Sequence, residues 1–179
     1  VAAGNPTEFS EGIGSALRAI SARRGSGSNA TVSGTSTAAG GKVFQAKYFA
    51  AKWYGELQAY SVSSSGVNTS TPLWTASIPA FATRKILTHN GTAGATFPTA
   101  AQTSVLTPDI ADYLRGDRSK EQPDTTPSTG RIYRQRTSLL GTIVDSSPTY
   151  VKASDGTETV YAGANDGMMH AIKGSDGTE

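Results

Sequence analysis

A repeating strand-and-turn pattern in the last third of the chain constrains the fold more than any other feature. The peptide Ser154–Glu158 (SDGTE) recurs 21 residues later as Ser175–Glu179. Between the copies lie two short runs of strand-forming residues, 159–164 and 168–172, separated by Asn165–Gly167. Asp, Asn and Gly are typical of tight turns because they tolerate positive φ. Short strands with a turn every ~10 residues predict an antiparallel meander, as in propellers, sandwiches and barrels.

Composition supports a β-rich chain and excludes several other classes. Of 179 residues, 36% are hydrophobic, 17% are charged, 20 are Gly and none is Cys. A helical bundle needs segments rich in Ala, Glu, Lys and Leu, whereas Ser, Thr and Gly are prominent here. The lack of Cys excludes thiol chemistry, disulfides and Cys-ligated zinc. No apolar run approaches the roughly 18 residues that span a bilayer, so we expect no direct membrane insertion.

The charge balance argues against a nucleic-acid partner. The net charge is +2, from 16 Lys and Arg against 14 Asp and Glu, which predicts no surface field of a single sign. Two arginine clusters lie near the ends of the chain, at Arg18, Arg23 and Arg24 and at Arg131, Arg134 and Arg136. Neither cluster is interleaved with enough of the aromatic side chains on which bases stack. We therefore expect no binding to DNA or RNA.

The first part of the chain predicts an amphipathic helix over Asn5–Arg24. Asn5 and Glu8 are spaced as a capping box, and Pro6 suits the first helical position. Apolar side chains then recur at helical spacing, at Phe9, Ile13, Leu17 and Ile20. The segment 25–41 is rich in Gly, Ser and Thr, which predicts a linker or a loosely held edge strand. We expect residues 1–24 to be the C-terminal helix of a preceding domain and 25–41 to be the boundary.

The remaining segment, 42–179, is interpreted as a second domain. Short runs of strand-forming residues bounded by turn residues predict four strands in its first part, at 43–50, 57–62, 73–76 and 84–88. The stretch from about 92 to 130 has weaker periodicity and is interpreted as an insertion. Inside it, Thr107 and Pro108 mark the start of a short helix that is capped by Gly116.

A longer self-similarity narrows the fold class. Residues 49–60 align with residues 161–172 through an aromatic residue, two small residues, a Gly and a later Ala. The two copies lie 112 residues apart, which exceeds one propeller blade of about 40–50 residues and implies intervening sequence. Radially repeated hairpins predict a mainly β chain that forms part of a β-propeller with antiparallel meander blades. We expect the chain to cover only the first part of that propeller.

The chain also resembles a known family over most of residues 5–179. Residues 160–171 look like the repeat of quinoprotein-type propellers. More specific segments resemble the PilY family of type IV pilus biogenesis and tip-adhesin proteins, at Tyr113–Ser119, Arg134–Arg136, Ser138–Gly141 and Ile143–Val151. The order of segments along the chain also resembles that of the family, in which a helix at the end of a von Willebrand A-like region precedes the first blades of the propeller. One departure is Thr142, where the pattern has an acidic residue.

The resemblance implies an exported, non-enzymatic protein of a Gram-negative bacterium, found in the periplasm, at the outer membrane surface or at the pilus tip. It implies roles in pilus assembly, surface adhesion and twitching motility. The implied partners are minor pilins and the pilus machinery, together with host or abiotic surfaces. PilY-like proteins carry a calcium loop that has no match in this chain, so we expect calcium elsewhere in the parent protein and no cofactor here. Two alternatives stay open, a quinoprotein-like periplasmic dehydrogenase and a generic propeller interaction scaffold.

Catalytic and metal-binding signals are weak. His89 and His170 lie on different predicted elements, with no acidic partner at a recognisable spacing, so we expect no catalytic residue. A calcium site needs several oxygen ligands at alternate positions before a Gly, together with a later Glu. Asn165–Gly167 and the Asp-Gly pairs offer too few such ligands and are interpreted as hairpin turns.

The tripeptide Arg115-Gly116-Asp117 is a candidate adhesion motif of the integrin-binding type. Adhesion would require it at an exposed, flexible tip. A structural role is favoured instead, because Gly116 is expected to cap a helix whose last turn carries Arg115. Asp117 is then free to pair with Arg118 or Lys120.

Overall fold

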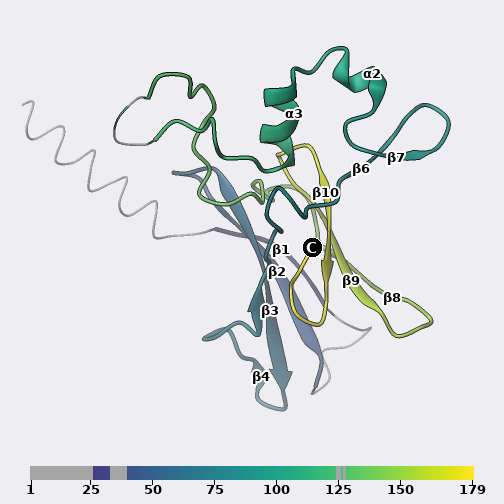
Figure 1. Ribbon diagram of the computed structural model, residues 1–179. Coiled ribbons are helices and arrows are strands. Elements are labelled where there is room, and N and C mark those ends of the chain that lie inside the picture. The colour runs from purple at the N-terminus through teal and green to yellow at the C-terminus, as the bar shows by residue number, and fades with distance from the viewer. Residues whose placement is uncertain (1–25, 33–39, 124–125, 127) are drawn as a thin grey trace, which may run out of the picture. The chain divides into compact units, whose positions relative to one another are not determined.

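The computed structural model describes residues 26–32, 40–123, 126 and 128–179 (Figure 1). Across those residues the protein is mainly β, with ten strands and two short helices, which confirms the predicted fold class. The helix expected at 5–24 lies outside the described residues.

The chain divides into two compact units. The first unit comprises residues 1–77 and 140–179, and the second comprises residues 78–139. The insertion expected at about 92–130 stays a prediction, and its expected range lies inside the second unit. The strand before residue 92 pairs with the strand after it in the same unit. The domain boundaries expected at 24 and 41 stay predictions.

The first sheet of the first unit is antiparallel, with the order β1-β2-β3-β4 and with β5 paired to the middle of β3. Its strands are β1 (Ser26–Val32), β2 (Lys42–Phe49), β3 (Tyr54–Ser63), β4 (Gly66–Val67) and β5 (Trp74–Thr75). Side-chain alternation places Phe44 and Ala46 of β2 and Leu57 and Ala59 of β3 in the core, each 0% exposed. Strand β1 falls in the segment predicted as a linker or edge strand, and it lies at the edge of the sheet.

The second sheet of the first unit is a three-stranded antiparallel meander in the order β10-β9-β8. Its strands are β8 (Thr149–Lys152), β9 (Glu158–Gly163) and β10 (Met169–Lys173). Both Ser-Asp-Gly-Thr-Glu copies form the predicted tight turns. In each copy the Asp carboxylate accepts a hydrogen bond of 2.9 Å from a Thr backbone N–H, from Thr157 to Asp155 and from Thr178 to Asp176. The fold therefore repeats the same turn where the sequence repeats.

The two aligned repeats fold as hairpins, but their registers differ. Phe49 pairs with Tyr54 across the loop 50–53, whereas Gly163 pairs with Met169 across the longer loop 164–168. The alignment makes Tyr161 equivalent to Phe49, but Tyr161 pairs with Ala171, so the two registers differ by five residues. A shift by an odd number of residues turns a strand side chain to the other face of its sheet. Leu57 is fully buried, whereas Met169, which the alignment makes equivalent to it, is 74% exposed. The alignment thus identifies both hairpins without matching burial at every position.

The indole of Trp74 joins the first sheet to the turn that follows the second sheet. Trp74 is buried on β5, and its Nε1 donates to the carbonyl oxygen of Gly174 at 3.2 Å. The ring lies so close to Gly177 that a Cβ built on Gly177 would be 2.7 Å from Trp74 Cε3. Gly177 also has a φ of +81°, a conformation that L side chains rarely adopt. Glycine is required there by the close approach and by the backbone.

Backbone and side-chain contacts extend this junction. The N–H of Ser77 donates to the Gly177 carbonyl at 2.8 Å, and the N–H of Glu179 donates to the Ser77 carbonyl at 3.2 Å. Lys42 Nζ lies 2.9 Å from the Gly174 carbonyl and from a Glu158 carboxylate oxygen. The two sheets thus share one core, whose largest fully buried side chains are Phe44, Leu57, Leu140, Ile143, Val160, His170 and Ile172.

The second unit contains one hairpin and two helices. The hairpin pairs β6 (Leu87–His89) with β7 (Gly94–Thr96), and the helices are α2 (Ala100–Thr103) and α3 (Pro108–Arg115). Thr107 caps α3 at its N-terminus and Gly116 caps its C-terminus with a φ of +117°, both as predicted. The strand predicted at 84–88 is wrong in its first half. Residues 80–84 form a turn in which the Arg84 N–H donates to the Ala80 carbonyl at 2.9 Å.

Replacing Gly177 with Ala is expected to destabilise the first unit by about 2–4 kcal/mol, because the new Cβ meets the Trp74 ring and the positive φ is strained. Gly156 is a matched control, since it occupies the same turn with a φ of +89° and nothing within 4 Å of its Cβ position. Gly156→Ala should cost only about 1–2 kcal/mol. Urea unfolding followed by tryptophan fluorescence measures both changes, and equal losses would contradict the packing role of Trp74.

Candidate functional site

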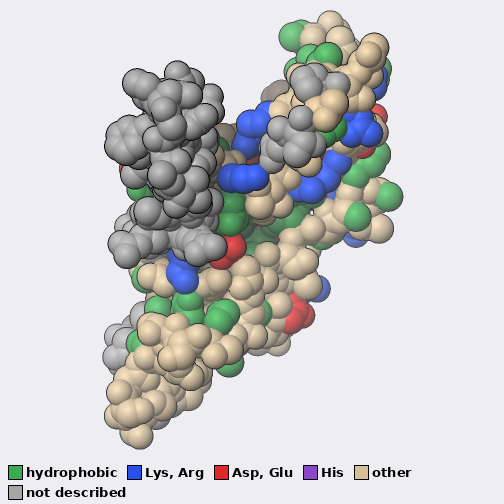
Figure 2. Space-filling model, turned by 90° about the vertical axis from the view of Figure 1, so that its left-hand side faces the viewer, with side chains coloured by type: hydrophobic (Ala, Val, Ile, Leu, Met, Phe, Trp, Pro, Cys, Tyr) green, Lys and Arg blue, Asp and Glu red, His purple; other side chains and the backbone are tan. Residues whose placement is uncertain are grey.

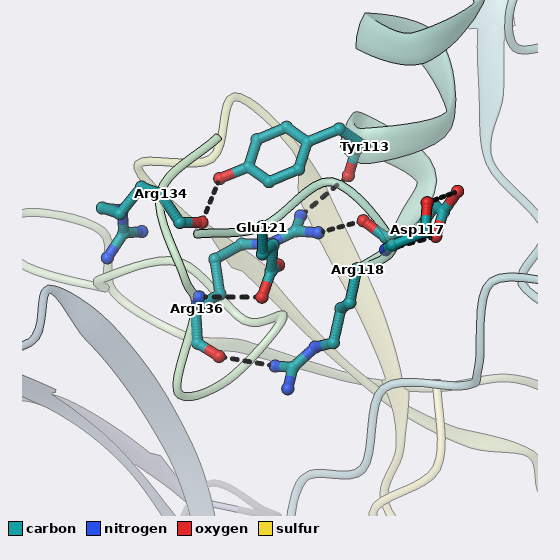
Figure 3. A network of polar contacts seen from close by, with 7 residues as sticks. Tyr113, Asp117, Arg118, Glu121, Arg134 and Arg136 are labelled. Atoms are coloured by element: carbon teal, nitrogen blue, oxygen red, sulfur yellow. Dashed lines mark hydrogen bonds and ion pairs between the residues drawn. The ribbon is translucent and has the colours of Figure 1, made fainter. Parts of the chain in front are cut away.

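The most connected polar site of the second unit is centred on the Arg136 guanidinium (Figure 3). Its Nε donates to Glu121 Oε1 at 2.6 Å, and its two Nη atoms donate to the backbone carbonyls of Tyr113 at 2.8 Å and Asp117 at 2.9 Å. The Arg136 and Glu121 side chains are only 11% and 5% exposed. Because carbonyls at the C-terminal end of a helix carry partial negative charge, Arg136 completes the capping of α3.

Aromatic contacts hold the Arg136 side chain in place. The guanidinium carbon lies 3.8 Å from the centroid of the Tyr113 ring, and the Tyr133 ring stacks on Tyr113 with centroids 4.5 Å apart. The hydroxyl of Tyr113 donates to the Arg134 carbonyl at 3.1 Å, and Arg118 donates to the Arg136 carbonyl at 2.8 Å. The segments that resemble the PilY family at 113–119 and 134–136 thus contact each other directly.

The candidate adhesion tripeptide lies within this network. Gly116 is buried as the cap of α3, and its N–H donates to the carbonyls of Asp112 and Tyr113. Arg115 lies 3.3 Å from the Asp112 carboxylate and 4.7 Å from the centroid of the Phe81 ring. The tripeptide is therefore a helix terminus with its own contacts, which is the structural placement that the sequence favoured. Its role in adhesion stays a prediction.

The carboxylate of Asp117 is used within its own turn. Its Oδ1 accepts from the backbone N–H of Ser119 at 2.8 Å, and its Oδ2 accepts from the Ser119 hydroxyl at 2.9 Å. The backbone hydrogen bond from Ser119 is the largest cause that lowers the pKa of Asp117 below its ordinary value. The pairing with Arg118 or Lys120 was expected instead. Lys120 pairs with Asp109, and Arg118 donates to a backbone carbonyl.

Cationic side chains surround this network at the surface. Arg118, Arg131 and Arg134 are exposed. Arg136 is half-buried when its backbone and side chain are counted together. Figure 2 shows Lys and Arg side chains gathered in one part of the visible face. Arg131 also donates to the backbone carbonyl of Glu121. The described part of the second unit therefore presents several guanidinium groups around a single buried carboxylate.

A second polar cluster, in the first unit, is centred on His170. This side chain on β10 is 0% exposed and uses both ring nitrogens. Its Nε2 lies 3.0 Å from Asp166 Oδ2, and its Nδ1 lies 2.6 Å from Glu179 Oε1. Asp166 Oδ2 also accepts from the N–H of Gly141 at 3.0 Å, and its Oδ1 accepts from the N–H of Met168 at 3.1 Å. The cluster joins β10 to the segment at Gly141 and to the turn at Glu179.

The electrostatics of this cluster favour a charged imidazole. Burial by itself lowers the pKa of His170, but hydrogen bonds and charge from Asp166 and Glu179 outweigh it and raise the pKa to about 9. Burial raises the pKa of Asp166, and the hydrogen bonds from His170, Gly141 and Met168 reverse that effect and lower it. His170 is therefore an imidazolium between two carboxylates at neutral pH. It has no lone pair available to act as a base.

The sequence analysis missed the acidic partners of His170. Asp166 stands four residues before His170, and the tight turn between β9 and β10 brings the two together. That spacing across a predicted hairpin was a usable signal. Glu179 was harder to foresee, because its approach depends on the pairing of residues 77 and 178. Thr142, which departs from the family pattern, bonds Asn165 through both its carbonyl and its hydroxyl.

The described surface of the second unit includes the following two recesses. One is lined by Asp109, Tyr113, Asp117, Ser119, Lys120 and Tyr133 and has a volume of about 10 Å³, room for one water. The other, of about 380 Å³, lies between the β6–β7 hairpin and α2, and its lining residues carry no charge. Among the described residues, no group of three or more His, Cys, Asp or Glu could hold a metal ion. None of the described helices has the length and apolar character to cross a membrane.

Two curated proteins are similar in sequence to the chain. One, named Type IV pilus biogenesis factor PilY1 homolog, from Xylella fastidiosa strain Temecula1, is 31% identical over 90% of the chain. The other, named Type IV pilus biogenesis factor PilY1, from Pseudomonas aeruginosa strain PAK, is 35% identical over 40% of the chain. The chain spans 15% of the length of the first protein, and the matched part is 8% of the second. No model of a protein family matches, and no solved structure matches.

Replacing Arg136 with Lys is expected to loosen the end of α3. Lys keeps the charge but cannot donate to three acceptors in the planar geometry of the guanidinium, so the local free energy of opening should fall by about 2–3 kcal/mol. Hydrogen exchange at the α3 amides of Ala111 and Leu114 measures this change. Lys85→Arg is the control, since Lys85 is exposed in the same unit and lies outside this network, and it should change the value by less than about 0.5 kcal/mol. Equal protection in Arg136→Lys and the unmodified protein would contradict the role of Arg136.

The stability of the first unit is expected to decline as pH rises. Because the folded pKa of His170, about 9, lies above its ordinary 6.5, its stabilising charge is fully present below pH 6.5 and is lost as pH rises through about 9. Asp166 has a lowered pKa, so its contribution is lost only in acid, as pH falls through its folded pKa. Urea unfolding at a series of pH values across the interval from 6.5 to about 9 measures the decline.

His170→Gln should remove the dependence on pH over that interval, because the amide does not titrate. His89→Gln is the control and should keep it, since His89 is exposed in the second unit. A slope that persists in His170→Gln would show that another group is responsible.

Proposed function

Because the chain belongs to the PilY family of type IV pilus biogenesis proteins, we propose that it is a non-enzymatic, partner-binding part of an exported pilus biogenesis factor. The parent protein acts in the cell envelope and works with the pilus machinery. The matched relatives are named as biogenesis factors, and the chain aligns with one of them over 90% of its length. The role of the whole protein is part of the proposal, since the chain spans only 15% of that relative.

The observation that carries the non-enzymatic role is the environment of His170. Its imidazole is the described group that comes nearest to a catalytic constellation, with a carboxylate on each ring nitrogen. A general base needs a free nitrogen within reach of substrate, and His170 is 0% exposed with both nitrogens engaged. The cluster supports packing of the first unit rather than turnover. Within this proposal the chain has no cofactor of its own, and calcium, where it acts, is bound elsewhere in the parent.

We extend the proposal to three more specific roles of the parent protein, which are pilus assembly at the tip, surface adhesion and twitching motility. Minor pilins are the proposed partners inside the envelope, and host or abiotic surfaces are the partners outside it. The exposed arginines at positions 118, 131 and 134 supply cationic groups for such contacts. The tripeptide at 115–117 takes part through its position at the end of α3, and Asp117 is not proposed as a free ligand-binding carboxylate, since Ser119 occupies it.

The test is complementation of a strain that lacks the parent gene, with surface pili and twitching as readouts. The full-length parent should restore both, and a full-length Gly177→Ala variant should restore markedly fewer pili because its first unit is destabilised. Gly156→Ala is the matched control and should restore nearly the full number. Restoration of pili by a parent that lacks residues 40–179 altogether would overturn the role in biogenesis.

Two further measurements test the adhesive role of the tripeptide and the alternative of a quinoprotein-like dehydrogenase. Asp117→Glu in the full-length parent should leave cell attachment unchanged, and loss of attachment with normal pili would make the tripeptide adhesive. Dye-linked alcohol oxidation by the parent supplied with pyrroloquinoline quinone and calcium should be absent. Oxidation that depends on the quinone would replace the binding role with the quinoprotein-like dehydrogenase.

A further inference from the structure

The loop between β6 and β7 holds an Asn-Gly pair in an unusual set of hydrogen bonds. Asn90 and Gly91 are exposed at the end of the hairpin whose last pair is His89 and Gly94. The N–H of Asn90 donates to the Ala93 carbonyl at 3.0 Å, which closes the loop. Gly91 has a φ of +102°, and nothing lies within 4 Å of its Cβ position.

Each reacting group of a succinimide-forming reaction is engaged by a suitable partner. The N–H of Gly91 donates to Nδ1 of His89 at 3.0 Å, so this imidazole carries its own proton on Nε2 and accepts at Nδ1. The side-chain oxygen of Asn90 accepts from the backbone N–H groups of Thr92 at 2.9 Å and Ala93 at 2.8 Å. A base on the nucleophile and two donors on the carbonyl oxygen are the arrangement that catalyses acyl transfer.

We propose that the Asn90-Gly91 turn is a self-modification site, at which Asn90 deamidates through a succinimide with His89 as the general base. This inference does not depend on the proposed function. It assigns a catalytic role to His89, which the pilus proposal does not use. The product is aspartate or isoaspartate at position 90, which adds a negative charge at the exposed end of the hairpin.

The reaction balances without an oxidant or a cofactor. The Gly91 nitrogen attacks Asn90 Cγ and gives its proton to His89 Nδ1. Negative charge develops on the Asn90 side-chain oxygen, where the N–H groups of Thr92 and Ala93 stabilise it. The side-chain nitrogen then leaves as ammonia after taking the proton back from His89. Water opens the resulting succinimide at either carbonyl and gives the two products.

The chain contains a matched internal control. Asn68 is also exposed, but its side-chain oxygen accepts a backbone hydrogen bond from Ser70 at 3.1 Å, and the residue after it is Thr69. Asn68 thus lacks both the Gly nucleophile and an adjacent His. In one sample of the folded protein, incubated at neutral pH, Asn90 should deamidate at least about a hundredfold faster than Asn68, the lower end of the range of about 10²–10⁴ that general acid–base catalysis supplies.

Site-resolved peptide mass spectrometry with time measures both rates. His89→Gln keeps an acceptor near the Gly91 N–H but cannot take a proton, so the rate at Asn90 should fall about tenfold. Incubation of the unmodified chain in urea tests the hairpin itself, and unfolding should lower the rate at Asn90 because it separates His89, Thr92 and Ala93 from the reacting atoms.

An unchanged rate in His89→Gln, with the hairpin shown intact by hydrogen exchange, would overturn the assignment of His89. A rate in urea equal to or above the rate in the folded chain would overturn the role of the turn. Should His89→Gln disturb the hairpin, the comparison between the folded chain and the chain in urea decides, because it uses the unmodified protein.

Discussion

The packing of the Trp74 indole on Gly177 is the contact on which the rest of the first unit depends. It joins β5, which belongs to the sheet of residues 26–75, to the turn after β10, about a hundred residues later in the chain. A Cβ at Gly177 would lie 2.7 Å from the ring, so the close approach needs glycine. Around it, Ser77 bonds the backbone at both Gly177 and Glu179, and Glu179 in turn reaches His170. The packing at Gly177 therefore positions both the backbone pairing at Ser77 and the buried ionic cluster around His170.

Charged groups in both units hold the backbone in place. Arg136 donates to two carbonyls at the end of α3 and to Glu121, and His170 holds Asp166 and Glu179 on either side of its ring. Burying such groups is costly unless each is paired and hydrogen-bonded. No described buried side-chain nitrogen or oxygen lacks a hydrogen-bond partner. This pattern is what a scaffold for partner binding requires, and it agrees with the proposed role in pilus biogenesis.

Local sequence patterns predicted the local structure, but they did not predict the contacts between segments that are distant in the chain. Alternation located β2 and β3, turn residues located both Asp-Gly turns, and a capping signal located α3 from Thr107 to Gly116. The repeat alignment does not match burial at Leu57 and Met169, because the two hairpins pair in registers that differ by five residues and an odd shift reverses the faces of a strand. The partners of Arg136 lie far from it in the chain, and the approach of Glu179 to His170 depends on the pairing with residue 77, so spacing alone could not predict either contact. Family resemblance found the segments at 113–119 and 134–136 without showing that they touch.

The most direct measurement of this account is native-state hydrogen exchange in Trp74→Phe, which removes the indole N–H and part of the ring that lies against Gly177. The amides of Leu57 on β3 and Ile172 on β10 report on the two sheets. If the Trp74 contact joins the sheets into one cooperative unit, protection at both amides should fall by the same free energy, about 1–3 kcal/mol. A loss confined to β3, with Ile172 as protected as in the unmodified protein, would contradict the account.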